Sequence, residues 1–285
     1  MDNRSRPTVS EFVQDARMQS PLDVFRDGLL AGHVALVTGG GTGICRGVAH
    51  AYARFGADVA IVSRKADVLE RAAAELSSAT GRKVIAIPAD VRDPDAVARA
   101  VAQTAERFGK LDTLVNGAAG NFLAPAAGLS PNGFRTVIDI DLVGTFNTTR
   151  AAFEVLRKSG NGLVLNISAT LHYHGTPLQI HASAAKAGVD AVTKNLAVEW
   201  GQFGIRACGI APGPIGDTEG MRRLAPGDVA KKAMSFIPAG RFGTIDEIAA
   251  AAVYLRSPAA AYITGHVMVV DGGQCVATPS LLGVT

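Results

Sequence analysis

A glycine-rich segment near the start of the chain has the composition of a phosphate-binding loop. Residues 38–44, TGGGTGI, join a short apolar run to a segment with helical spacing. Glycine lets the backbone turn tightly and approach a pyrophosphate, and a helix that begins there directs free N–H groups and the positive end of its dipole at the anion. A glycine cluster alone can be a plain turn, but a place between strand and helix favours a dinucleotide site. The expected contacts are Gly39, Gly41, Thr42, Gly43 and Ile44.

Two charged residues further along bear on which dinucleotide binds. Arg64 follows the second expected strand, where an acidic residue would favour NAD. A guanidinium can instead pair with the 2′-phosphate of NADP, so Arg64 predicts NADPH unless it is an ordinary solvated side chain. Asp90 follows the third expected strand and could accept a hydrogen bond from the adenine amine. The alternative role of a helix cap suits Asp93 better, because Asp93 precedes Pro94.

The segment His172-Tyr173-His174 contains two side chains that can ligate metals. No cysteine or acidic residue has a suitable spacing for a further ligand, so we expect no metal site. Tyr173 has two open interpretations. It could be a displaced catalytic acid, or it could line a substrate pocket or simply belong to a loop.

These residues lie on a regular alternation of strand-like and helix-like segments. Short apolar runs predict strands at residues 33–38, 58–63, 84–88, 111–115, 162–167, 206–210 and 267–270. Helical spacing predicts helices at residues 44–55, 66–79, 94–108, 134–156 and 183–203. Strands that alternate with helices of this length indicate βαβ units and a parallel sheet, and therefore an α/β fold.

The organisation of the chain indicates a single domain with two additions. Residues 1–30 are polar and irregular, and we expect them to form an arm ahead of one domain at residues 31–285. A polar helical stretch at about residues 217–237 is expected to form a flexible lid. We find no internal repeat, linker or low-complexity segment in the sequence.

Composition and charge exclude several functional classes. The chain has 285 residues, 48% of them hydrophobic and 19% charged, which is enough apolar material for a large core. A net charge of +3 without a basic block argues against nucleic acid and anionic membranes as partners. Three distant cysteines fit a reducing compartment, and no apolar run is long enough to span a membrane. Residues 1–23 do not resemble a secretory signal, and residues 283–285 lack a Ser-Lys-Leu tag, so we expect a cytoplasmic protein.

The motifs taken together resemble the short-chain dehydrogenase/reductase family. The resemblance covers about residues 30–275 and rests on residues 38–44, 90–91, 116–120, Lys186 and 212–215. It implies a Rossmann-type, doubly wound parallel sheet of seven strands, and a homotetramer. The family's catalytic Tyr and Ser correspond here to Ala182 and Ala169, and its structural Asn corresponds to Asp141. Of the family's four site residues, only Lys186 is present.

Several segments are more specifically similar to the peroxisomal-type 2,4-dienoyl-CoA reductases. They are residues 117–122, 139–146, 181–186, 197–200 and 212–223. In that group an Asp and the Lys replace the site based on Tyr. The resemblance therefore implies an oxidoreductase that uses NADPH to reduce 2,4-dienoyl-CoA to trans-3-enoyl-CoA, with an acyl-CoA as the substrate partner. Other enoyl thioester reductases of the family, and a catalytically silent NADP-binding relative, remain alternatives.

The resemblance also implies roles for individual residues. The expected catalytic pair is Asp141 and Lys186, although Asp141 could equally form a structural ion pair with Lys186. Further cofactor contacts are expected at Val91, Asn116, Lys186, Pro212, Gly213, Ile215 and Thr218. Substrate contacts are expected at Arg64, Arg92, Phe122, Ser130, Pro131, Asn132 and Arg223. Alternatively, Phe122 could simply pack within its loop, and the arginines could be ordinary solvent-exposed side chains.

The missing Tyr and Ser agree with this chemistry. A ketone reductase must protonate an alkoxide oxygen during hydride transfer, and a phenol with a lowered pKa serves that purpose. A conjugated thioester accepts hydride at carbon, and the charge flows to the thioester oxygen while the proton finally goes to carbon. The sequence therefore disfavours alcohol chemistry more than reduction of a conjugated C=C bond.

Overall fold

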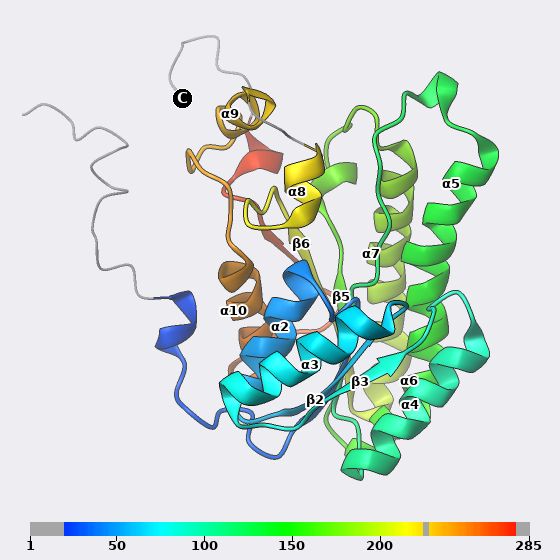
Figure 1. The fold of residues 1–285 in the computed structure, drawn as a ribbon, viewed down its shortest axis with the longest axis vertical. Coiled ribbons are helices and arrows are strands. Elements are labelled where there is room, and N and C mark those ends of the chain that lie inside the picture. The colour runs from blue at the N-terminus through cyan, green and yellow to red at the C-terminus, as the bar shows by residue number, and fades with distance from the viewer. Residues whose placement is uncertain (1–19, 225–227, 278–285) are drawn as a thin grey trace, which may run out of the picture.

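The computed structural model describes residues 20–224 and 228–277 and contains one parallel sheet (Figure 1). The strands are β1 (Val34–Thr38), β2 (Asp58–Ser63), β3 (Val84–Pro88), β4 (Thr113–Asn116), β5 (Gly162–Ile167), β6 (Ile205–Pro212) and β7 (Val267–Val270). Their order across the sheet is β3-β2-β1-β4-β5-β6-β7, and every neighbouring pair is parallel. The predicted seven-stranded Rossmann-type sheet is confirmed.

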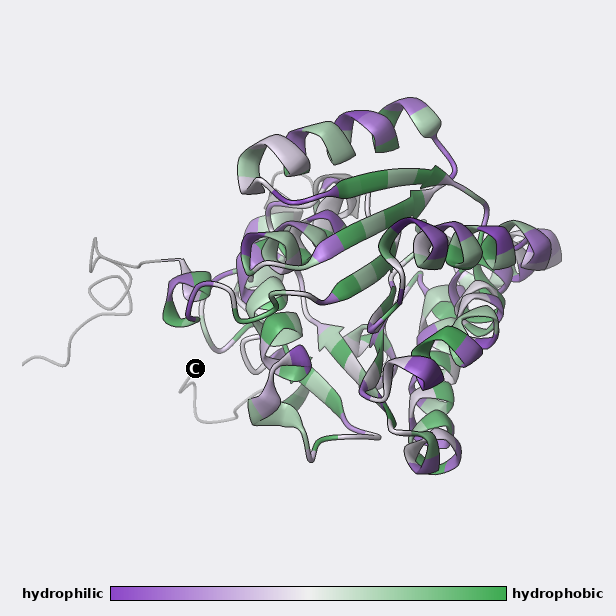
Figure 2. Cartoon of the chain, turned by 90° about the horizontal axis from the view of Figure 1, so that it is seen from below, coloured by the Kyte–Doolittle hydropathy of each residue, from purple (hydrophilic) through white to green (hydrophobic). Residues whose placement is uncertain are grey.

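Helices cover both faces of the sheet because alternate strand side chains point to opposite faces. One face packs against α2 (Gly43–Arg54), α3 (Ala66–Thr80) and α10 (Ile245–Arg256). The other face packs against α4 (Pro94–Phe108), α6 (Gly144–Ser159) and α7 (Ile180–Trp200). In β1, Ala35 and Val37 belong to the first core and Val34 and Leu36 to the second. Figure 2 shows the apolar strands enclosed between helices whose polar residues lie outside.

The strand order reverses between β1 and β4, which creates a crevice at the carboxyl ends of the strands. Thr38 ends β1, and its hydroxyl oxygen accepts hydrogen bonds from the backbone N–H groups of Gly117 (3.0 Å) and Ala118 (3.2 Å) just after β4. This link fixes the phosphate-binding loop against the loop that follows β4. The predicted chemistry-bearing residues therefore lie around one crevice.

The structure corrects the long helix predicted at residues 134–156. That segment is α5 (Pro131–Ile138), then a π-helical turn (Asp139–Val143), then α6. A π turn adds one residue to the helical repeat, so it rotates the side chains that precede it relative to those that follow. Apolar periodicity did not reveal it, because the turn keeps the helical direction.

The sequence analysis did not assign α10. Its start carries a capping box, in which the Thr244 hydroxyl accepts from the Glu247 N–H and the Glu247 carboxylate accepts from the Thr244 N–H. This pattern of Thr followed three residues later by Glu was a usable signal. No helix in the described ranges is long and apolar enough to cross a membrane.

The structure describes part of the expected N-terminal arm and part of the expected lid. Residues 1–19 of the expected arm lie outside the described residues, whereas residues 20–30 pack on the domain. Leu22 and Leu30 are buried in the core, and the Ser20 hydroxyl donates to Asp246 of α10 (2.8 Å). The core therefore includes residues assigned to the arm. The expected lid contains two short helices, α8 (Glu219–Leu224) and α9 (Asp228–Met234).

Candidate active site

The phosphate-binding loop has a shape that only small residues allow. Gly39 has a φ of 70°, and a Cβ there would lie 2.7 Å from the carbonyl oxygen of Gly117. Gly43 has a φ of 55° with no atom within 4 Å of its Cβ position, so its outer side is open. The helix α2 begins at Gly43, and the side chain of its N-cap, Thr42, makes no capping hydrogen bond. The free N–H groups at this helix end suit a pyrophosphate, so the residues present fit a dinucleotide.

Arg64, Asp90 and Arg92 lie together at the carboxyl ends of β2 and β3. The Arg92 guanidinium donates to both carboxylate oxygens of Asp90, at 2.5–3.1 Å. These hydrogen bonds lower the pKa of Asp90, and the nearby charge of Arg64 contributes in the same direction. The residue predicted to bind adenine is thus already paired with a residue predicted to bind the substrate. Val91, between them, is buried against Gly144 at the start of α6.

Asp141 and Lys186 form a buried ion pair at the centre of the crevice. Their side chains approach to 3.3 Å, and they are 1% and 7% exposed. The Lys186 ammonium also donates to the carbonyl oxygen of Ile167 (3.0 Å), at the end of β5. The second oxygen of Asp141 accepts from the Gly120 N–H (2.7 Å). The structure therefore brings together the two residues predicted to be catalytic, from the π turn and from α7.

The environment of Asp141 raises the pKa of its carboxyl group above that of an ordinary aspartate. Burial raises the pKa of Asp141, although the Lys186 charge and the Gly120 hydrogen bond oppose this effect. Desolvation is the largest influence because the charged carboxylate loses water that two partners only partly replace. A carboxyl group that holds its proton to a higher pH than usual is suited to proton transfer.

No hydroxyl occupies the positions of the family's Ser and Tyr. Ala169 directly follows Ser168, and Ala182 is buried in α7, one turn before Lys186. Tyr173 does not replace them, because its hydroxyl donates to Asp190 (2.8 Å). Burial and the Asp190 carboxylate raise the pKa of Tyr173, which makes it a weaker acid. The hypothesis of a displaced phenolic acid therefore loses its support.

His181 is a residue of this site that the sequence analysis left without a role. Its side chain is fully buried, and neither ring nitrogen has a hydrogen-bond partner in the described part of the chain. The ring stacks on Phe122 with centroids 4.4 Å apart. The signal in the sequence was its place, five residues before Lys186, at the start of a long helix.

The side chain of Asn116 forms hydrogen bonds in the interior of the fold. Its amide nitrogen donates to Thr149 of α6 and to Asn166 of β5, both at 2.9 Å. Asn166 in turn donates to Thr193 of α7 (2.8 Å). This network joins β4 and β5 to two helices, whereas the Asn116 carbonyl oxygen is buried without a hydrogen-bond partner among the described residues.

The segment after β6 closes the crevice at the expected nicotinamide end. Pro212 ends the strand, and a Cβ on Gly213 would lie 2.7 Å from the Asp271 side chain, so the chain needs glycine there. Ile215 is buried and forms a parallel bridge with Gly243. The Thr218 hydroxyl accepts from the Met221 N–H (3.1 Å) within α8. Gly213, Ile215 and Thr218, which are predicted to contact the cofactor, thus also contact other residues of the protein.

The predicted substrate residues divide into two groups. Phe122 lies close to Gly133, so it joins Ser130, Pro131 and Asn132 at the start of α5. Ser130 is the N-cap of that helix, and its hydroxyl accepts from the Gly133 N–H (3.0 Å). Arg64 and Arg92 form the second group, beside Asp90. Arg223 belongs to α8, but its side chain lies outside the described residues.

Comparison with known proteins gives close relatives over most of the chain. The family model described as Enoyl-(Acyl carrier protein) reductase matches residues 39–274. The peroxisomal 2,4-dienoyl-CoA reductase of Arabidopsis thaliana is 48% identical over 271 residues, 92% of this chain and 90% of the relative. The Saccharomyces cerevisiae protein of that name is 50% identical over 253 residues, 88% and 86% of the two chains. A short chain dehydrogenase of Bacillus anthracis has a similar crystal structure, with a TM-score of 0.80 and 41% identity over 88% of this chain and 100% of its own.

The comparison overturns one expectation and establishes another. The expected cytoplasmic location is wrong by this finding, because the plant and yeast relatives are named as peroxisomal enzymes. That expectation rested on elimination, from residues 1–23 and from residues 283–285. The match over residues 39–274, with the fold and these identities, shows that the chain belongs to the short-chain dehydrogenase/reductase family, as an oxidoreductase with a nicotinamide dinucleotide cofactor.

Proposed function

We propose that this protein reduces 2,4-dienoyl-CoA to trans-3-enoyl-CoA with NADPH, in the degradation of unsaturated fatty acids. The observation that carries the proposal is the buried Asp141–Lys186 pair beside alanines 169 and 182. Relatives whose names state this reaction, with (3E)-enoyl-CoA as product, are 45–50% identical to this chain. NADPH is preferred over NADH because Arg64 follows β2, where the 2′-phosphate binds in this fold.

Each residue of the pair has a separate role in the reaction. When NADPH is bound at this loop and crevice, it would supply hydride to the δ-carbon of the conjugated acyl group, and the thioester oxygen would take up the displaced electrons. The Lys186 ammonium, which is buried, stabilises this negative charge. Asp141 holds a proton, and a water molecule passes it to the α-carbon. The product keeps one C=C bond, between the β and γ carbons.

The remaining predicted residues bind the two ligands. The start of α2 holds the pyrophosphate, Lys186 holds the nicotinamide ribose, and Arg64 and Arg92 neutralise phosphates. Phe122 stacks on the flat acyl group, while α8 and α9 form the lid of residues 217–237. We further propose a homotetramer. The half-exposed Phe146 on α6 and the exposed Val198 on α7 are apolar surfaces that a second subunit could cover.

Oxidation of NADPH with three thioesters in parallel tests the function. The expected result is turnover of 2,4-hexadienoyl-CoA, with little activity on crotonyl-CoA or acetoacetyl-CoA. Preferred turnover of crotonyl-CoA supports instead a 2-enoyl thioester reductase, the activity that the description of the matching family model suggests. Binding of NADPH without turnover of any thioester supports a catalytically silent relative.

Two substitutions test the roles within the pair. Asp141→Ala and Lys186→Ala are compared with the unaltered protein after each has been loaded with NADPH. Both are expected to lose most of their turnover of 2,4-hexadienoyl-CoA, by about 10²-fold or more for a positioned proton donor or charge stabiliser. Unchanged turnover in either variant removes that residue from the mechanism.

A further inference from the structure

Two hydrogen bonds join the loop after β4 to the segment that leads into α7. The backbone N–H of Ala124 donates to the carbonyl oxygen of Leu178 (2.9 Å). The side-chain amide of Asn121 donates to the side-chain oxygen of Gln179 (2.6 Å). We refer to residues 178–181 as the strap, because these contacts hold the loop against it although the two segments are far apart in the sequence.

Phe122 lies between the two residues of the loop that bond to the strap. Its ring packs on the ring of His181 with centroids 4.4 Å apart. His181 is fully buried, whereas Phe122 is 39% exposed, so part of the Phe122 ring stays accessible to a ligand. Because the backbone is held on both sides of Phe122, the strap determines where this ring lies.

The backbone of the strap is strained at Leu178. Its φ is 65°, and every other described residue with a positive φ is a glycine. The left-handed region is crowded for a residue with a Cβ, and leucine has no polar group that could relieve the strain by a local hydrogen bond. Leu178 is also 44% exposed, so burial of its side chain does not compensate for this cost. Such strain persists only where other contacts impose it, and it is typical of ligand-binding segments.

We propose that Leu178 and Gln179 are positioning residues that hold Phe122 in place for the flat acyl group of the substrate. This inference rests on the proposed function, in which Phe122 stacks on that group. The strain at Leu178 opposes the two hydrogen bonds, so the conformation that holds Phe122 is only weakly favoured. The apparent affinity for the acyl group then depends on the fraction of molecules in that conformation, and small changes in the strap alter it.

Three substitutions of Leu178 separate the effect of its backbone from that of its side chain. Leu178→Gly and Leu178→Asn accept a positive φ more easily than leucine, but both remove the apolar side chain. Leu178→Val keeps an apolar side chain, but its branched Cβ makes a positive φ more costly. The inference requires that glycine and asparagine preserve binding and that valine weakens it. A contact through the apolar side chain would give the reverse order.

Substitutions of the amide pair test its hydrogen bond. Asn121→Ala and Gln179→Ala each remove this bond, so the double variant should lose no more affinity than one of them. The exchange of Asn121→Gln with Gln179→Asn keeps the summed length of the two side chains and should restore the bond. Asn195→Ala is the matched control, because Asn195 is exposed on α7 and its amide donates to Ala191 of the same helix (2.8 Å).

The dissociation constants of 2,4-hexadienoyl-CoA and of CoA are measured by calorimetry on the NADP⁺-loaded protein. Leu178→Val, Asn121→Ala and Gln179→Ala are expected to raise the constant of 2,4-hexadienoyl-CoA by about 3- to 10-fold, and to leave that of CoA within about 2-fold. Leu178→Gly, Leu178→Asn, the exchanged pair and Asn195→Ala should stay within about 2-fold for both ligands.

Two further measurements separate placement of Phe122 from a general effect on folding. The KM for 2,4-hexadienoyl-CoA should rise in the weakened variants while kcat stays within about 2-fold, because the catalytic pair is unaltered. Amide hydrogen exchange at Ala124, whose N–H donates to the strap, should become faster in Leu178→Val. Thermal melting and NADPH affinity show whether each variant folds, and the amide pair keeps the test decisive if Leu178→Val does not.

Three results overturn the inference. They are unchanged affinity of the weakened variants for 2,4-hexadienoyl-CoA, an equal loss of affinity for CoA, and weaker binding by Leu178→Gly and Leu178→Asn than by Leu178→Val. The titrations use NADP⁺, so they need no turnover. An unaltered protein that binds 2,4-hexadienoyl-CoA more tightly than CoA but does not reduce it with NADPH refutes the proposed function alone.

Discussion

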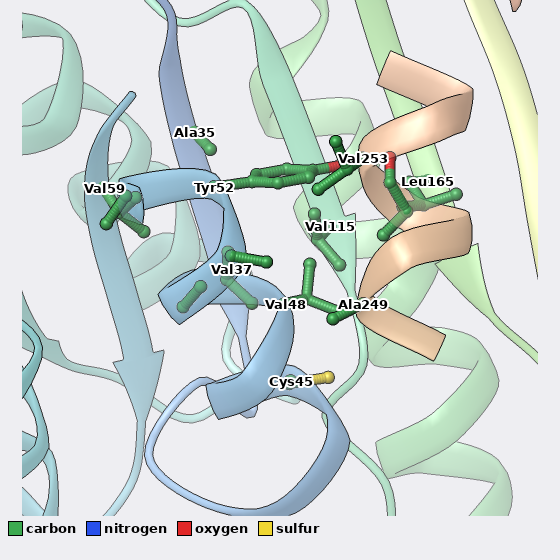
Figure 3. Packing of buried hydrophobic residues seen from close by; sticks show 14 of the residues in the cluster. Ala35, Val37, Cys45, Val48, Tyr52, Val59, Val115, Leu165, Ala249 and Val253 are labelled. Carbon is green, nitrogen blue, oxygen red and sulfur yellow. Dashed lines mark hydrogen bonds between the residues drawn. The ribbon is translucent and has the colours of Figure 1, made fainter. Parts of the chain in front are cut away.

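Cys45 and Gly117 pack directly against each other between α2 and the end of β4. A larger residue at position 117 therefore requires a smaller one at position 45. Cys45 is buried, and Figure 3 shows it in the core below Val48. A Cβ on Gly117 would lie 2.0 Å from the Cys45 sulfur. Because atoms in contact stay about 3.5–4.0 Å apart, Gly117→Ala creates an overlap of about 1.5 Å.

The magnitudes follow from overlap and cavity formation. Gly117→Ala is expected to lower the free energy of unfolding by about 3 kcal/mol, the upper part of the usual range for overpacking. Cys45→Ala leaves a small cavity and costs about 1 kcal/mol. In the double variant the new methyl group fills the space of the sulfur, so the total cost is about 1–2 kcal/mol rather than 4. A small strain persists, because Ile167 is 3.3 Å from the new atom.

Urea unfolding of the four proteins at one protein concentration measures this coupling. Gly201→Ala is the control, because nothing lies within 4 Å of its Cβ position, and it should change stability little. The Kd for NADPH is expected to rise in Gly117→Ala alone, since Gly117 holds the Thr38 hydroxyl at the phosphate loop. A double variant whose destabilisation equals the sum of the single effects within about 0.5 kcal/mol would refute the reasoning.

Three further predictions concern the site and its support. Burial raises the pKa of Asp141, so activity that needs its acid form persists to a higher pH than for an ordinary Asp. This activity falls as the pH rises through that pKa. Asp141→Asn should remove this decrease from the profile of kcat/KM against pH. Arg64→Ala should raise the KM for NADPH about 10-fold or more and leave that for NADH unchanged, as steady-state kinetics can show. Thr244→Ala should destabilise the protein by about 1 kcal/mol in urea unfolding, through loss of the α10 cap.

Local sequence patterns were enough to predict several parts of the fold and of the site. The seven strands and the helices at α2, α3, α4 and α7 followed from apolar periodicity, because a sheet covered on both faces needs continuous apolar strands. The phosphate loop followed from its glycines, which Gly39 shows to be required by a positive φ and a close carbonyl. The missing hydroxyls at Ala169 and Ala182 were also visible at once, because residue identity at a known spacing needs no coordinates.

Other features depended on packing between distant segments. Asp141 meets the Gly120 N–H, 21 positions away, only because a π turn redirects the start of α6. Asn116 looked like a cofactor contact, yet its amide nitrogen donates to partners from two other elements, Thr149 of α6 and Asn166 of β5. No periodicity in the sequence encodes such contacts, since they depend on how helices dock on the sheet.

The sequence by itself determined the α/β architecture, the glycine loop, and the absence of hydroxyl groups at positions 169 and 182. Only the tertiary structure decided which side chains are buried together, and therefore which protonation states they favour. Asp141 gains a raised pKa from burial, and Asp190 gains hydrogen bonds from the hydroxyl groups of Ser168 and Tyr173. The physical reason is that residue type sets what a group can do, whereas desolvation and partners, which arise only on folding, set its charge and proton.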